Sequence, residues 1–192
     1  NGLVGLLLGV MVGLGLAFLL EYLDDSIKFP DEVERYTGLT LLGVIPKVSA
    51  KEGDPTEVLL KDPRSALAES YRSLRTALQF STSQGAPRTL CVTSCTKNEG
   101  KSTTAYSIAL TLAQLGRRVL LVDGDMRNPS LHRLFNSDHT AGLSNLLSSD
   151  VDPISVTRRT EHNNLFYISA GPLPPNPAEL LSGANLAKLL NP

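Results

Sequence analysis

The feature that most constrains this chain is the stretch SCTKNEGKST at residues 94–103. An apolar, β-prone run (TLCVT) precedes it at 89–93, and small and apolar side chains follow at helical spacing over 102–115, up to Gly116. A Gly-Lys-Ser ending between a strand and a helix is typical of a phosphate-binding loop, because backbone N–H groups at the amino end of a helix attract anions. The sequence therefore predicts a nucleotide site in an α/β domain.

The beginning of this loop departs from the common pattern G-x-x-x-x-G-K-[ST]. Cys95 stands where the first glycine would be, although the closing Gly-Lys-Ser is intact. Asn98 suits a sharp turn before Gly100, because asparagine tolerates positive φ better than other non-glycine residues. We expect the nucleotide phosphates to meet the backbone N–H groups and side chains of Lys97, Asn98, Glu99, Gly100, Lys101, Ser102 and Thr103.

Two carboxylates follow the next apolar strand, in the run RVLLVDGD at 118–125. Strand, loop, helix and strand would form a βαβ unit, which places Asp123 and Asp125 beside the loop. The run VLLVD could also be the ordinary metal-binding strand of a simple P-loop enzyme. The second carboxylate and Arg127 favour a D-x-D-x-R site, with Arg127 among the nucleotide-binding residues.

The residue types of this site predict its chemistry. Lys101 is expected to reach the β and γ phosphates, and the Ser102 hydroxyl to bind Mg²⁺. Asp123 would hold the metal, directly or through water, or accept a proton from the attacking hydroxyl, and Asp125 would order that network. We therefore predict Lys101, Asp123 and Asp125 as catalytic and Ser102 and Asp123 as metal ligands.

A second constraint is the uncharged run LVGLLLGVMVGLGLAFLL at residues 3–20. As a helix it would reach about 27 Å, close to the roughly 30 Å hydrocarbon core of a bilayer. A buried core helix and a signal peptide are the alternatives, but the run has no leading Met, basic leader or small-residue cleavage site. We predict a transmembrane helix over 1–22 whose Gly5, Gly9 and Gly13 share one face, a spacing that lets membrane helices approach closely. The charges after it do not favour the cytoplasmic side, so the cytoplasmic placement is inferred from the nucleotide site.

Residues 23–62 form the predicted juxtamembrane segment and 63–192 the nucleotide-binding domain. Within the segment we expect a helix over 31–36, a strand over 41–45 and a polar connector over 47–56.

A further helix is predicted to begin at Asp62-Pro63, since an aspartate cap followed by proline is a typical helix start. Its apolar stripe comprises Leu67, Tyr71, Leu74 and Leu78. A second stripe, three residues apart, comprises Glu69, Arg72 and Arg75. This charged stripe could be a solvated face, or the two guanidinium groups could meet carboxylates of a neighbouring subunit. The spacing alone leaves both interpretations open.

The composition adds little chemistry. The net charge of -1 argues against a nucleic-acid platform. Cys91 and Cys95 stand four apart with no histidine nearby, which indicates neither a disulfide framework nor a zinc site and favours a reducing compartment. We interpret His132 as a packing or hydrogen-bonding residue, and Asn176-Pro177 as the cap of a short helix.

These motifs together resemble the bacterial tyrosine kinases (BY-kinases) of capsule and exopolysaccharide assembly, in the chain-length-determinant or polysaccharide co-polymerase family. The resemblance comprises the E-x-x-R-x-x-R of the charged stripe, the ending E-G-K-S-T of the loop and D-x-D-x-R at 123–127. It runs over essentially the whole chain, from the glycine-rich membrane helix through AFLLEYLDDSIKFPDEVERYTGLTLLGVIP to GPLPPNPAELLS at 171–182.

The resemblance implies an α/β fold with a P-loop NTPase-type parallel sheet flanked by helices, a deviant Walker A loop and one preceding transmembrane helix. It implies an ATP- and Mg²⁺-dependent protein-tyrosine autokinase at the bacterial inner membrane, with its catalytic domain in the cytoplasm. Glu69, Arg72 and Arg75 would build a ring of subunits. Polysaccharide polymerase or export machinery and a cognate tyrosine phosphatase would be partners, and nucleic acid would not.

Two departures qualify this expectation. Relatives have Pro-Gly where this chain has Lys97-Asn98, so the nucleotide affinity is expected to differ. The Walker B strand and the tyrosine-rich tail are expected beyond Pro192, so this piece would lack a metal ligand, a core strand and acceptor tyrosines, and would be inactive alone.

Two other functions compete with the kinase. One is a co-polymerase in which ATP gates ring assembly without phosphoryl transfer to protein. The other is a partitioning-type ATPase, which carries a lysine five residues before the loop lysine, where this chain has Thr96.

Overall fold

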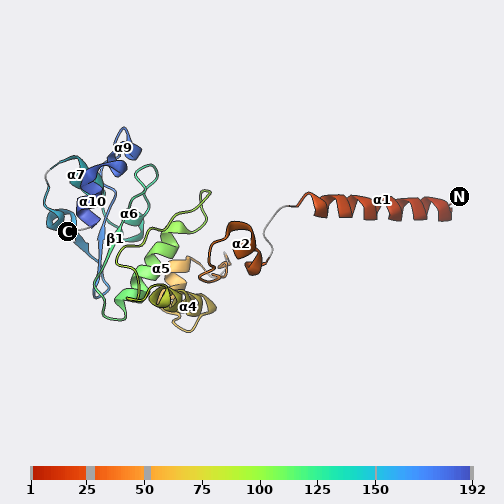
Figure 1. Ribbon diagram of the computed structural model, residues 1–192, viewed down its shortest axis with the longest axis horizontal. Coiled ribbons are helices and arrows are strands. Elements are labelled where there is room, and N and C mark those ends of the chain that lie inside the picture. The colour runs from red at the N-terminus through yellow and green to blue at the C-terminus, as the bar shows by residue number, and fades with distance from the viewer. Residues whose placement is uncertain (1, 25–28, 50–52, 150, 191–192) are drawn as a thin grey trace. The chain divides into compact units, whose positions relative to one another are not determined.

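The computed structural model describes residues 2–24, 29–49, 53–149 and 151–190, and its contacts divide the chain into two units, Asn1–Leu41 and Leu42–Pro192. The first unit contains helices α1 (Gly2–Tyr22) and α2 (Pro30–Thr37) (Figure 1). Helix α1 exposes its apolar side chains along its whole length and is long and apolar enough to cross a membrane, which confirms the predicted helix and makes it a candidate span. Helix α2 confirms the prediction over 31–36 and ends at Gly38, whose φ is +68°.

The strand predicted over 41–45 is wrong. Residues 38–49 form no strand in the structure, because no described segment pairs with them. The backbone N–H of Leu41 donates to the Glu34 side chain at 2.9 Å instead of to a neighbouring strand.

In the second unit, helix α3 (Pro55–Lys61) occupies part of the predicted connector. Asp54 caps it by accepting from the backbone N–H of Thr56 at 2.8 Å. The next helix, α4 (Ala66–Phe80), begins later than predicted: its cap is Ser65, which accepts from the N–H of Ala68 at 3.2 Å, whereas Asp62 ends α3. Asp62 and Ser65 are both residue types that can cap a helix start. Because Asp62 is the C-cap of α3, Ser65 caps α4.

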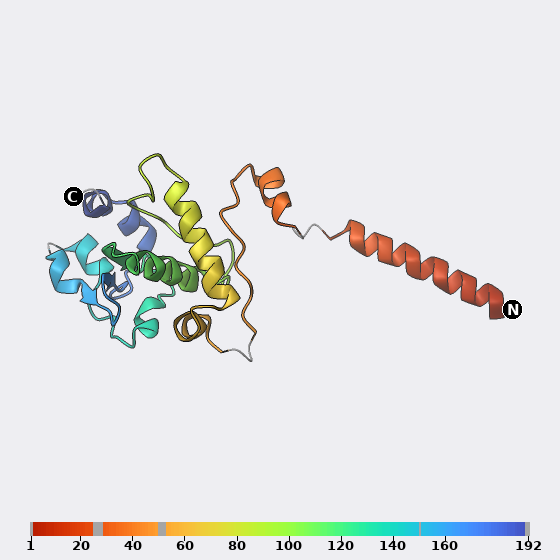
Figure 2. The same ribbon diagram turned by 90° about the horizontal axis from the view of Figure 1, so that it is seen from below.

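Helices α4 and α5 (Lys101–Ala113) lie side by side (Figures 1 and 2). The predicted apolar stripe of α4 is confirmed, since Leu67, Tyr71, Leu74 and Leu78 are all buried. They join a core that includes Leu110 of α5 and Leu165 of the sheet, each only 1% exposed. Gly116, with φ +82°, ends the α5 segment as predicted. This core fixes the amino end of α5, where the loop lies.

The sheet has three strands in the order β1 (Val119–Val122), β3 (Leu165–Ile168) and β2 (Arg158–Arg159). Strand β1 is parallel to β3, with Val119 opposite Leu165, and β2 is antiparallel to β3. The sheet is therefore mixed and not wholly parallel. Helices α6 (Leu131–Leu134), α7 (Leu143–Ser148), α8 (Pro153–Val156), α9 (Pro177–Ser182) and α10 (Ala184–Leu190) complete the unit. Helix α9 starts at the predicted Asn176 cap, which accepts from Glu179 N–H at 3.4 Å.

The strand predicted over 89–93 is also wrong, so the expected βαβ unit lacks its first strand. Residues 90–94 have no regular structure, and Leu90 is 44% exposed. Strand β1 has one hydrogen-bonded neighbour among the described residues, β3, and its Leu120 is 46% exposed. An apolar run becomes a strand only when a ladder partner receives its N–H and C=O groups, and the described part of the chain places none beside 89–93.

Candidate functional site

The predicted phosphate loop does turn into the amino end of a helix. Helix α5 begins at Lys101, directly after Gly100, whose φ is +80°. Asn98 has φ +63°, which confirms the predicted left-handed turn. The N–H groups of the first helical turn have no partners inside the helix, so the backbone there is suited to binding an anion.

The carboxylate of Glu99 accepts hydrogen bonds from the first half of the loop. Glu99 accepts from the backbone N–H of Cys95 at 3.0 Å and of Thr96 at 3.1 Å, and from the Thr96 hydroxyl at 2.7 Å. These bonds, the Thr96 hydroxyl first, hold the pKa of the Glu99 carboxyl below its usual value. The loop thus needs no glycine at position 95, because Glu99 holds the bend that the glycine would otherwise allow. Lys97 lies on the exposed tip of this bend.

Lys101 and Asp125 form the central ion pair of the site. The Lys101 Nζ lies 2.8 Å from Asp125 Oδ2, and both side chains are about one third exposed or less, at 35% and 27%. Asp125 Oδ1 accepts from the backbone N–H groups of Arg127 and Asn128 at 3.2 and 2.9 Å. Burial opposes ionisation of Asp125, but the hydrogen bonds from Lys101 and Asn128 outweigh it and lower the pKa of that carboxyl. The loop lysine and the second carboxylate are thus brought together as predicted.

Asp123 is buried and organises the backbone that follows β1. Its Oδ1 accepts from the N–H of Asp125 at 3.1 Å, and its Oδ2 accepts from the N–H groups of Ser130 and Leu131 at 3.0 Å each. We predicted that Asp125 orders the metal network; in the structure Asp123 and Asp125 both accept backbone N–H groups of the segment after β1. A carboxylate oxygen has a second lone pair, so Asp123 can still reach a metal through one water.

Ser130 also belongs to this site, although no sequence pattern predicted it. The Ser130 hydroxyl donates to the Ser102 hydroxyl at 2.6 Å, across 28 positions of the chain. No spacing rule connects two such distant residues. The only signal in the sequence is that Ser130 follows the D-x-D-x-R run.

The remaining predicted residues lie close by in sequence but make fewer contacts. The Thr103 carbonyl accepts from the Ser107 hydroxyl at 2.7 Å, inside α5. Arg127 is exposed, and its backbone N–H, not its side chain, donates to Asp125. His132 packs its ring 4.7 Å from that of His139, and burial together with the charges of His139 and Arg133 lowers its pKa. This packing agrees with the predicted non-catalytic role of His132.

The donors gathered here fit a nucleotide with Mg²⁺. Among the described residues no group of three or more His, Cys, Asp or Glu side chains could hold a metal by itself. Mg²⁺ at phosphate sites usually takes only one or two protein ligands, with phosphate oxygens and water as the others. One hydroxyl, Ser102, and the anchored carboxylate of Asp123 match that pattern.

The arginine side chains of the charged stripe of α4 make contacts within their own subunit. Arg72 Nε lies 3.4 Å from Glu69, and an Arg72 Nη donates to the Pro63 carbonyl. Arg75 donates to the Thr111 carbonyl of α5 at 3.3 Å, while its buried Nε has no partner. Neither guanidinium pairs with a carboxylate of another helix in the described part of the chain. Both arginines are half-buried.

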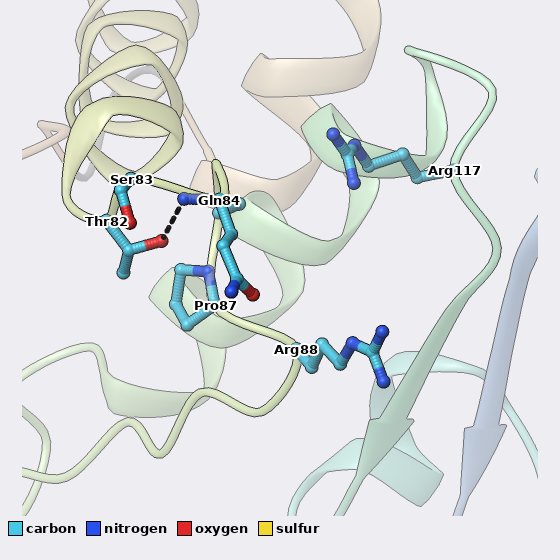
Figure 3. Close-up of a pocket in the computed structure, with 7 residues that line it drawn as sticks. Thr82, Ser83, Gln84, Pro87, Arg88 and Arg117 are labelled. Atoms are coloured by element: carbon cyan, nitrogen blue, oxygen red, sulfur yellow. Dashed lines mark hydrogen bonds between the residues drawn. The ribbon is translucent and has the colours of Figure 1, made fainter.

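A cavity of about 490 Å³ lies elsewhere in the second unit and contains none of the predicted site residues (Figure 3). Its lining includes Thr82, Gln84, Arg88 and Arg117. Arg88 directly precedes the 89–93 run, and Arg117 lies just before β1.

Known proteins resemble the chain over most of its length. The model of the ParA family that is described as "NUBPL iron-transfer P-loop NTPase" matches residues 86–189. The tyrosine-protein kinase YwqD of Bacillus subtilis is 36% identical over 132 residues, which are 69% of this chain and 56% of that protein. The putative tyrosine-protein kinase EpsB of Ralstonia nicotianae is 33% identical over 194 residues, 96% of this chain and 26% of that protein. The BceF tyrosine kinase domain superposes with a TM-score of 0.74 at 37% identity, covering 86% of this chain and 71% of that domain. The chain thus spans about half the length of YwqD and about a quarter of EpsB.

Proposed function

Because this chain belongs to the ParA family of P-loop NTPases, we propose that it binds ATP with Mg²⁺ and transfers the γ-phosphoryl group to tyrosine side chains of its own kind. The observation that carries this proposal is the convergence of Lys101, Ser102 and the two carboxylates at the amino end of α5. Similarity to tyrosine-protein kinases over this same region supports tyrosine as the acceptor.

The roles follow from the contacts. The N–H groups of the first turn of α5 would bind phosphate oxygens, and Lys101 would exchange Asp125 for a phosphate. Ser102, with Asp123 through water, would hold Mg²⁺, which would neutralise negative charge on the phosphates. Asp125, once free of Lys101, is the more accessible carboxylate and would accept the proton of the tyrosine hydroxyl. The Walker B strand that the resemblance implies would add a further metal carboxylate.

The kinase proposal is tested by incubating the full-length protein with ATP and Mg²⁺. Phosphotyrosine should accumulate on the protein, and chelation of Mg²⁺ with EDTA should prevent it, because phosphoryl transfer needs the metal to neutralise charge on the phosphates. Mass spectrometry of tyrosine-containing peptides is the measurement. If the protein binds ATP and assembles without any phosphotyrosine, the co-polymerase alternative replaces the kinase.

Thr96 argues against a partitioning-type ATPase. The lysine of that class would have to project from this position, but here the Thr96 hydroxyl donates to Glu99 inside the loop. The candidate membrane helix α1 argues against that class as well.

We place the protein in the bacterial inner membrane through α1, with its nucleotide-binding domain in the cytoplasm. The partners that fit this placement are further copies of the chain in a ring, the machinery of polysaccharide polymerisation or export, and an opposing tyrosine phosphatase. Support for them comes from the resemblance to BY-kinases and from the named tyrosine kinases above.

The ring depends on the charged stripe Glu69, Arg72 and Arg75. Replacing both arginines with alanine should convert the ring to smaller species in sedimentation, because these half-buried guanidinium groups would no longer be present to meet a neighbour's carboxylates. Arg64→Ala is the matched control, since Arg64 is exposed and outside the stripe. An oligomer of unchanged size would show that the stripe is a solvated face. The melting temperature must be followed in parallel, because Arg75 also contacts Thr111.

A further inference from the structure

Ser130 contacts both residues that we predict to hold the metal. Its hydroxyl donates to the Ser102 hydroxyl at 2.6 Å, and its backbone N–H donates to Asp123 Oδ2 at 3.0 Å. Ser102 comes from the amino end of α5 and Asp123 follows β1. In the described part of the chain, Ser130 thus joins these two elements at the proposed metal position.

The position of Ser130 at the start of α6 makes its hydroxyl bond informative. Ser130 is the N-cap residue of this helix, and a serine there usually turns its oxygen toward the N–H groups of the first turn. Its side chain makes no such cap bond. The N–H of Leu131 goes to Asp123 instead, and the Ser130 hydroxyl is free to reach Ser102.

This bond restricts the Ser102 hydroxyl. A serine oxygen has two lone pairs, and the bond from Ser130 uses one of them, which leaves the other for a cation. It also holds Ser102 in one side-chain rotamer. Mg²⁺ requires near-octahedral geometry at about 2.0–2.1 Å, so a ligand that is already oriented binds it better than one that rotates.

We propose that Ser130 is a positioning residue for Mg²⁺: it orients the Ser102 hydroxyl and, through its backbone, the Asp123 carboxylate. This inference rests on the proposed nucleotide and Mg²⁺ site. Hydrogen-bond partners of metal ligands commonly change metal affinity by about 10- to 100-fold when they are removed.

The test compares Ser130→Ala, Ser130→Thr and wild type as full-length proteins. A fluorescent ADP analogue is titrated at increasing Mg²⁺ concentrations and in EDTA. For Ser130→Ala the Mg²⁺ concentration at half-maximal tight binding should rise by about 10- to 100-fold. The affinity for the nucleotide in EDTA and the melting temperature of the free protein should not change, because the hydroxyl caps no helix. Ser130→Thr keeps the hydroxyl and should behave like wild type, as should Ser155→Ala in the remote helix α8.

The outcomes separate the inference from the function. An unchanged Mg²⁺ requirement in Ser130→Ala would overturn the positioning role. A loss of nucleotide affinity in EDTA, or a lowered melting temperature, would mean that Ser130 supports the fold of the loop and not the metal, which also overturns it. If wild type bound the ADP analogue no better with Mg²⁺ than in EDTA, the proposed function itself would fail, and this inference with it.

Discussion

Lys101→Met is expected to lower the affinity for ATP by about 30-fold or more and to abolish tyrosine phosphorylation. Removal of one partner of a partly buried charge pair costs about 2–5 kcal/mol, and each 1.4 kcal/mol is a factor of ten in affinity. Lys101 is the ammonium group at the start of α5 that can exchange Asp125 for phosphate. Methionine keeps the length and flexibility of the side chain and removes only the charge.

Isothermal titration with ATP and Mg²⁺, followed by detection of phosphotyrosine, measures both effects on the full-length protein. Lys47→Met is the matched control, because Lys47 is exposed and lies outside the loop. It should bind ATP like wild type. Phosphorylation that survives Lys101→Met would show that the phosphate site lies elsewhere.

Asp123→Asn should lower the free energy of unfolding by about 2–3 kcal/mol. Hydrogen bonds to a charged group contribute about 1.5–3 kcal/mol each, and the buried Asp123 carboxylate accepts three of them from the backbone of 125–131. Asparagine has the same shape, but its NH₂ group must face at least one of these N–H donors. The change therefore removes one or more bonds and leaves a buried donor without an acceptor.

Urea unfolding followed by circular dichroism gives this quantity. Asp152→Asn is the control, since Asp152 is exposed and accepts one N–H at the start of α8, a role that asparagine fills equally well. The control should change stability by less than about 0.5 kcal/mol. Equal effects of the two substitutions would mean that the Asp123 bonds do not order the segment after β1.

Local chemistry alone explains the features of the site that were predicted correctly. Helix α5 and the buried stripe of α4 follow from the spacing of their apolar side chains. The left-handed turn at Asn98 follows from the conformational tolerance of asparagine, and the closeness of the loop to the carboxylates follows from a motif in which both flank one helix. Each of these inferences needs only residues that are near one another in sequence.

Contacts between distant segments decided the rest. The runs 41–45 and 89–93 have the composition of strands but no ladder partner in the described part of the chain, so they form none. The start of α4 depends on the neighbouring helix α3, because Asp62 ends α3 and cannot also cap α4. The link from Ser130 to Ser102 spans 28 positions. Which backbone N–H groups turn toward Asp123 and which toward Asp125 depends on how the segment after β1 packs. The sequence by itself determined the turn at Asn98 and the helix that begins at Lys101, because both depend on local chemistry. Only the tertiary structure decided which hydrogen bonds fix Ser102, Asp123 and Asp125 in place, because hydrogen bonds between segments depend on how the chain packs.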